Sequence, residues 1–160
     1  RSGYPSSAFS FLPEILERAG NDDKGSITAV YTVLTEDNDF SDPVAEEARS
    51  LLDGHIVLSE KRAQAGKWPA VDLLRSISRV SDNVVPDRIS EAAAFLKKME
   101  SAYQENEDLI LMGAYRRGTS KETDLAMDRK TRIEAFLTQK RNEFWPICKT
   151  FEALITLVEV

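Results

Sequence analysis

The chain has 160 residues, of which 42% are apolar, and a formal net charge of −6 at pH 7. This length allows one domain or two small ones with a buried core, and the acidic balance argues against nucleic acid as the main partner, because nucleic-acid-binding proteins usually present a basic face. The single cysteine, Cys148, excludes an internal disulfide framework and is typical of a cytoplasmic protein. No apolar run is long enough to cross a bilayer. Since the first residues show neither a methionine nor a signal segment, we expect a piece of a longer protein.

The first half of the chain is predicted to alternate helices and strands. SAFSFLPEILERAG has apolar residues at helical spacing and ends at Gly20. Residues 26–34, SITAVYTVL, are β-branched and almost continuously apolar, which is typical of a strand covered on both faces. After an acidic loop, Pro43 opens a helix that Asp42 caps. HIVLS and WPAVDLL are further extended segments around the short helical stretch EKRAQAG, and this order predicts a parallel sheet layered with helices.

The second half is predicted to be helical almost throughout. Apolar residues recur at helical spacing from Asp87 to Met112, and the glycines of GAYRRGTS then interrupt the pattern. Ser120 caps the next helix, SKETDLAMDRKTRIEAFLTQ, and FEALITLVEV forms the last one. We therefore predict an α/β domain over residues 1–82, followed by an all-α domain over residues 83–160.

Little catalytic chemistry is visible from the residues alone. His55 is the only histidine, so no histidine triad can form, and a structural role at a strand end is expected. Cys148, beside Trp145 and Pro146, is expected to be a buried, inert thiol. The sequence GxxxxGK[ST] is absent, so the chain has no such loop to hold nucleotide phosphates.

An arginine at the end of LLRSISRV stands out, because Arg79 follows an apolar segment at the boundary between the two halves. From the residues alone, we favour an ion pair with a local acid such as Asp72 or Asp82.

Four long stretches carry a family resemblance: SGYPSSAFSFLPEILERAG, KGSITAVYTVLTEDNDFSDPVAEEARSLLDGHIVLS, WPAVDLLRSISRV and YQENEDLILMGAY. Together they resemble the C-terminal part of the type III secretion ATPases, which include the flagellar export and injectisome enzymes and are related to the rotary ATP synthase subunits. The resemblance covers essentially the whole chain. It implies the second half of a RecA-like P-loop NTPase sheet, followed by a C-terminal helical domain. It also implies that ATP and Mg²⁺ are bound mainly by an upstream region.

The resemblance assigns roles to three residues. Arg79 matches the arginine finger, which reaches from one subunit into the nucleotide site of its neighbour. Trp68 stands where relatives usually carry a tyrosine before PA[IV]D, and it either stacks on adenine or caps a hydrophobic patch. Phe136 lies in a region that closes over adenine in the family, although its helical spacing with Ile133 and Leu137 favours a place in the core.

Two loops match segments that face a central stalk in rotary relatives. One is acidic and hydroxyl-bearing, and an acidic ring repeated around a hexamer would attract a basic partner; the other is a small basic turn. Ordinary solvated loops remain the alternative for both. The residues concerned are Asp37, Asp39, Ser41 and Asp42 in the first loop, and Arg116 and Arg117 in the second.

The resemblance implies a cytoplasmic bacterial homohexamer that hydrolyses ATP to drive protein export, peripheral to the inner-membrane export apparatus. Its implied partners are its own copies, the stalk, export chaperone–substrate complexes and the export gate, with no nucleic acid. By itself the chain is expected not to hydrolyse ATP. The alternatives are a non-catalytic interaction module that kept this half of the fold and, less well matched, a rotary ATP synthase subunit. Flagellar and injectisome membership both stay open.

Overall fold

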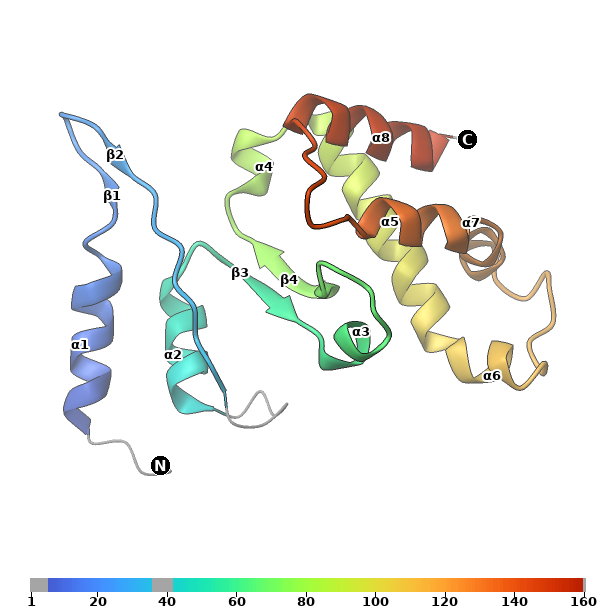
Figure 1. Ribbon diagram of the computed structural model, residues 1–160, viewed down its shortest axis with the longest axis horizontal. Helices are drawn as coiled ribbons and strands as arrows, with labels where there is room; N and C mark the ends of the chain where they lie inside the picture. Colours follow the sequence, from blue (N-terminus) through green and yellow to red (C-terminus); the bar gives the residue numbers. More distant parts are fainter. Residues whose placement is uncertain (1–5, 36–41, 160) are drawn as a thin grey trace. The chain divides into compact units, whose positions relative to one another are not determined.

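The computed structural model describes residues 6–35 and 42–159 (Figure 1). The chain divides into two compact units, Arg1–His55 and Ile56–Val160. No helix in the described ranges is long and apolar enough to span a membrane.

The first unit contains two helices that pack on each other and a short antiparallel hairpin, in which Gly20 pairs with Ile27. The side-chain oxygen of Asp42 accepts hydrogen bonds from the backbone N–H groups of Val44 and Ala45, both at 2.9 Å. This confirms the predicted cap of the second helix. The elements are α1 (Ser6–Leu16), β1 (Gly20–Asn21), β2 (Ser26–Ile27), α2 (Pro43–Leu51) and the start of β3 (Gly54–Leu58).

The long strand predicted over residues 26–34 is wrong for this chain. Only Ser26–Ile27 is a strand, and the segment that follows has no regular structure, with Val30 91% and Leu34 89% exposed. A strand covered on both faces needs neighbouring strands for its backbone groups and apolar layers for its side chains. In the described part of the chain no other segment supplies them, and the predicted parallel sheet is reduced to two separate strand pairs, β1–β2 and β3–β4.

The second unit begins at Ile56, within β3. The strand β4 (Val71–Ser78) pairs with β3, and the short helix α3 (Glu60–Gln64) lies between them in sequence. The hydroxyl of Ser59 caps α3 by accepting from the N–H of Arg62 at 3.3 Å. The link back to β4 contains a cis peptide bond between Trp68 and Pro69. A single helical turn, α4 (Ser81–Val84), follows β4.

The rest of the second unit is helical, as predicted. The long apolar run from Asp87 breaks at Asn106, whose side-chain amide donates to the carbonyl of Ala102 at 2.9 Å and thereby competes with continued helical bonding. The hydroxyl of Ser120 accepts from the N–H of Thr123 at 3.2 Å, so its predicted capping role is confirmed. The helices are α5 (Asp87–Glu105), α6 (Glu107–Leu111), α7 (Lys121–Leu137) and α8 (Ile147–Glu159).

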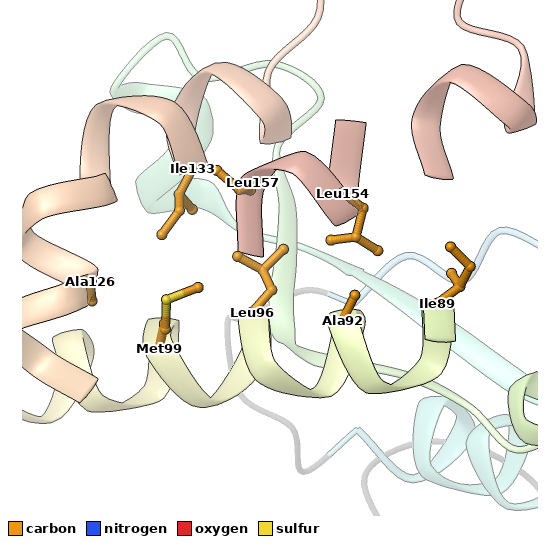
Figure 2. Close-up of a cluster of buried hydrophobic side chains, with 8 residues drawn as sticks. All are labelled: Ile89, Ala92, Leu96, Met99, Ala126, Ile133, Leu154 and Leu157. Carbon is orange, nitrogen blue, oxygen red and sulfur yellow. The ribbon is translucent and has the colours of Figure 1, made fainter. Parts of the chain in front are cut away.

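Figure 2 shows the core of this unit, where α5, α7 and α8 bury one apolar stripe each. The stripe on α5 follows the predicted helical spacing and faces small and branched side chains of the other two helices. The buried cluster consists of Ile89, Ala92, Leu96 and Met99 of α5, Ala126 and Ile133 of α7, and Leu154 and Leu157 of α8.

Cys148 was predicted to be buried, and it is exposed. It lies at the start of α8, beside Ile147, which is also exposed, because α8 turns Leu154 and Leu157 toward the core instead. The apolar surroundings of the cysteine in the sequence therefore did not mark the buried face.

Met99 offers a direct test of this core, because its side chain is fully buried. Replacing it with alanine leaves a cavity, and we expect Met99→Ala to lower the free energy of unfolding by about 2–5 kcal/mol in a urea titration. Met112→Ala is the matched control, since Met112 is 71% exposed, and it should change stability by less than about 0.5 kcal/mol. Equal effects of the two substitutions would contradict the core described above.

Candidate functional site

Arg79 lies directly after the last residue of β4 and is exposed to solvent. Two contacts fix the path of this strand on the helical core. Leu73 packs against the core cluster, and the ammonium of Lys97 on α5 donates to the carbonyl of Ser76 at 3.1 Å. The helical part of the unit thus holds the strand end from which Arg79 projects.

The two acids considered as local partners for Arg79 both make contacts of their own. One side-chain oxygen of Asp72 accepts from the N–H groups of Leu74 and Arg75, at 3.1 and 3.0 Å. The carboxylate of Asp82 accepts from the hydroxyl of Ser81 at 3.4 Å. The role of Arg79 itself stays a prediction.

Trp68 lies at the rim of an open groove, and it is 57% exposed. Its backbone carbonyl accepts from the N–H of Gln139 at 2.7 Å, which ties the loop to the segment that follows α7. One side of the groove is formed by the end of the α3–β4 link and the other by the end of α7 and the next residues. The lining includes Lys67, Trp68 and Pro69 on the first side and Thr138, Gln139, Lys140, Arg141 and Glu143 on the second.

Phe136 takes the core position that its helical spacing favoured. It is partly buried and packs against the core cluster, and it does not line the groove beside Trp68. Its contact with adenine stays a prediction.

Of the residues proposed to face a stalk, the structure describes both arginines of the basic turn but only Asp42 of the acidic loop. Asp37, Asp39 and Ser41 lie outside the described residues. Asp42 serves as the cap of α2. Arg116 and Arg117 are exposed in the turn between α6 and α7.

An ion pair and hydrogen bonds within the chain hold this basic turn. Arg117 forms an ion pair with Asp128 at 2.9 Å, so part of its charge is paired within the chain. Asp124 on α7 accepts from the N–H of Gly118 at 2.7 Å and from the Tyr115 hydroxyl at 3.1 Å. The turn is therefore held to the first turns of α7 while both arginine side chains face solvent.

A cluster of charges centred on Glu134 was not predicted from the sequence. Its carboxylate meets three cations: Lys67 at 2.9 Å, Arg62 at 3.4 Å and Lys130 at 3.7 Å. Lys67 and Arg62 belong to the α3–β4 region, whereas Glu134 and Lys130 lie on α7. Only the Lys130–Glu134 pair, four residues apart on one helix, has a signature that sequence reasoning could have found.

The cluster extends to α5 through Lys130. Its ammonium binds Glu100 at 3.0 Å and lies 3.9 Å from the centre of the Tyr103 ring, a cation–π geometry. Glu100 is one of the two buried polar or charged residues of the described chain, the other being Thr123. Helices α5 and α7 are therefore linked by charge as well as by apolar packing.

Electrostatics favour the ionised form of Glu134. Burial raises its pKa, but the hydrogen bond from Lys67 and the charges of Arg62, Lys67 and Lys130 outweigh burial, so the pKa lies below its ordinary value. Within the described ranges, no group of three or more His, Cys, Asp or Glu side chains could hold a metal ion.

Known proteins match both halves of the chain. Residues 1–78 match the nucleotide-binding domain of the ATP synthase alpha/beta family, and residues 85–156 match the T3SS EscN ATPase C-terminal domain. The chain is 44% identical, over 99% of its length, to the type 3 secretion system ATPase of Xanthomonas euvesicatoria. The chain belongs to the type III secretion ATPase family.

Two further matches show how much of a family member this chain represents. It is 43% identical, over 95% of its length, to the flagellum-specific ATP synthase of Helicobacter pylori strain J99. It also matches the assembled ATPase EscN in complex with its central stalk EscO, from enteropathogenic E. coli, with a TM-score of 0.88 and 43% identity over 99% of the chain. The chain spans 36% of the Xanthomonas protein, 35% of the Helicobacter protein and 37% of the EscN chain. The fold class is confirmed at this level: a nucleotide-binding fragment followed by an all-helical C-terminal domain.

The lowered pKa of Glu134 in this family member predicts a pH dependence of stability. Because the folded-state pKa lies below its ordinary value, the stabilisation is fully present above about pH 4.5 and is lost as the pH falls through the folded-state pKa. We expect Glu134→Gln to lower the free energy of unfolding at pH 7 and to flatten its decline as the pH falls below 4.5. Chemical denaturation across this range measures both effects.

Glu122→Gln is a suitable control, because Glu122 also lies on α7 and also has a lowered pKa, through its hydrogen bond from Lys98. That pair is much more exposed, so its contribution should disappear in about 1 M salt, where the Debye length is about 3 Å. Part of the Glu134 contribution should survive the same salt. Identical pH and salt profiles for the two variants would show that burial of the cluster has no energetic consequence.

Proposed function

We propose that this chain is the C-terminal part of a ring-forming, homohexameric ATPase that couples ATP hydrolysis to protein export by a type III secretion or flagellar apparatus. The observation that carries the proposal is the placement of Arg79, exposed at the end of a strand that α5 holds. The names of the relatives support the activity, and their greater length supports an upstream region that completes the enzyme.

Arg79 acts in this proposal on the nucleotide of a neighbouring subunit. Phosphoryl transfer spreads negative charge over the γ-phosphate oxygens, and a fixed guanidinium stabilises that charge. Arginine is better suited to this task than lysine, because its planar fork donates two hydrogen bonds in a fixed geometry and stays charged. The exposed strand end is compatible with reaching another subunit.

The residues of this chain suit the base of a nucleotide, but they include no loop that would hold its phosphates. The exposed ring of Trp68, with Lys67, Lys140 and Arg141 around the same groove, suits an aromatic base carrying negative charge nearby. Phe136 would support that base only from within the core. The chain has no phosphate-binding loop and, among its described residues, no acidic cluster for a cation. Mg²⁺ and the phosphates of ATP are therefore assigned mainly to the upstream region.

The domain boundary is proposed at residues 82–83. This position lies within α4, the single turn between β4 and the long helix α5. Residues 1–82 then form the end of the ATPase domain and residues 83–160 the helical domain.

The helical domain is proposed to bind chaperone–substrate complexes and the export gate, and its basic turn, with Arg116 and Arg117, to face a central stalk. The acidic loop of Asp37, Asp39, Ser41 and Asp42 is proposed to face the same stalk. A relative in this family has been solved with its central stalk, which supports such a partner. The ring is proposed to work in the cytoplasm, associated peripherally with the inner membrane.

Arg79→Ala in the full-length protein is expected to lower kcat for ATP hydrolysis by roughly 10³-fold or more, with little change in ATP binding. Arg75→Ala is the matched control, since Arg75 is an exposed arginine within β4, four residues before Arg79. Steady-state ATPase assays of purified rings measure the effect, and the 160-residue chain alone supplies the inactive baseline. Near-normal turnover by Arg79→Ala would make Arg79 a structural ion-pair residue.

Mixed rings separate action in trans from action within one subunit. Subunits carrying Arg79→Ala, co-assembled with subunits whose phosphate-binding loop is disabled, should recover part of the activity. In such rings an intact loop can meet an intact arginine of its neighbour. Proven co-assembly without recovery would remove the main support for a finger in trans.

The acidic loop predicts a salt-dependent response to a basic stalk. Asp37→Asn with Asp39→Asn should weaken stimulation by the stalk more at low salt than at high salt, because exposed charges interact over about 8–10 Å at physiological ionic strength. Asp42 is left unchanged because it caps α2, and Asp23→Asn, an exposed acid of the β1–β2 turn, is the control. If stimulation by the stalk is unchanged at every salt concentration, the acidic loop is an ordinary solvated connection and does not bind the stalk.

A further inference from the structure

We propose that Glu134 is a positioning residue for the nucleotide base, because it clamps the segment that carries Trp68 to the end of α7. This inference rests on the proposed function, in which Trp68 contacts the base. Glu134 itself does not line the groove beside Trp68, so its effect on the base is exerted through the loop.

The clamp holds the loop on both sides of its turn. Lys67, directly before Trp68, donates to one carboxylate oxygen of Glu134 at 2.9 Å, and Arg62 donates to the other at 3.4 Å. The backbone N–H of Lys67 also donates to the carbonyl of Arg62 at 2.9 Å, which closes the loop on itself. Five residues after Glu134, the N–H of Gln139 donates to the carbonyl of Trp68.

Because this clamp is partly buried, removing one of its partners costs more than breaking a surface ion pair. The side chains of Glu134 and Arg62 are only 19% and 16% exposed, so solvent screens their interaction poorly. The anchor is also rigid, because the adjacent Ile133 is fully buried in the helical core. Trp68, in contrast, is 57% exposed, so the core does not enclose it. Its orientation therefore depends on the backbone that Glu134 and Gln139 hold.

A structural role alone predicts a different outcome from a positioning role. If Glu134 only stabilises the fold, its loss lowers the melting temperature and the active fraction, which reduces the apparent kcat and leaves KM unchanged. If Glu134 positions Trp68, its loss weakens binding of the base and raises KM for ATP, while kcat per folded ring stays nearly constant.

The test uses Glu134→Gln in the full-length protein, with Glu122→Gln as the matched control. Glu122 is on the same helix and forms an ion pair at 2.8 Å, but its partner, Lys98, lies on α5 and not in the segment that carries Trp68. We expect KM for ATP to rise roughly tenfold in Glu134→Gln, the scale of one lost hydrogen bond to a charged group, and to stay unchanged in the control. Glu134→Asp, which keeps the charge, should recover part of the loss.

Hydrogen exchange in the nucleotide-free protein separates the clamp from the base contact. The amide of Gln139 should exchange faster in Glu134→Gln, because its bond to the Trp68 carbonyl is loosened. Unchanged exchange would overturn the clamp. Faster exchange with an unchanged KM, in a protein where Trp68→Ala does raise KM, would overturn the positioning role. If Trp68→Ala also leaves KM unchanged, the proposed base contact fails, and the positioning role fails with it.

Discussion

A single carboxylate, that of Glu134, is the point at which three parts of the second unit are held together. It faces two cations from the α3–β4 region and, through Lys130, connects to Glu100 on α5. Removing one member of such a partly buried cluster leaves the remaining charges poorly compensated, which costs more than the loss of an exposed pair. The apolar core sets where α5, α7 and α8 lie, and this cluster sets where the strand-bearing segment lies on them.

This arrangement connects the helical domain to the proposed chemistry. Lys97 on α5 holds β4 three residues before Arg79, and α7 with its following residues holds the loop of Trp68. In the proposed ring, these two residues serve different nucleotides, one in a neighbouring subunit and one in their own. A change in the packing of α5 against α7 would therefore shift the positions of both Arg79 and Trp68. The match to the ATP synthase alpha/beta family ends at residue 78, and the match to the EscN C-terminal domain begins at residue 85. The change from one to the other therefore falls directly after β4.

Local sequence rules predicted the features that local interactions determine. The caps at Asp42 and Ser120 and the buried stripe of α5 depend on residues a few positions apart, and all were predicted correctly. The long strand over residues 26–34 was not, because its stability depends on partner strands that the described chain does not provide. In the Glu134 cluster, Lys67 lies 67 positions and Arg62 lies 72 positions before Glu134 in the sequence. No periodicity of the sequence marks pairs at such separations. Arg79 stood out by its place in the sequence, but the roles given to Arg79 and Trp68 came from family resemblance alone, and they stay predictions.

The most direct test of the account is a structure of the full-length ring with a non-hydrolysable ATP analogue. We expect the guanidinium of Arg79 to lie within about 3 Å, which is hydrogen-bond distance, of a γ-phosphate oxygen on the nucleotide held by the neighbouring subunit. We also expect Glu134 still to contact Lys67 in that ring. A ring in which every Arg79 pairs with an acid of its own chain, and none approaches a nucleotide, would show that Arg79 is not a finger acting in trans.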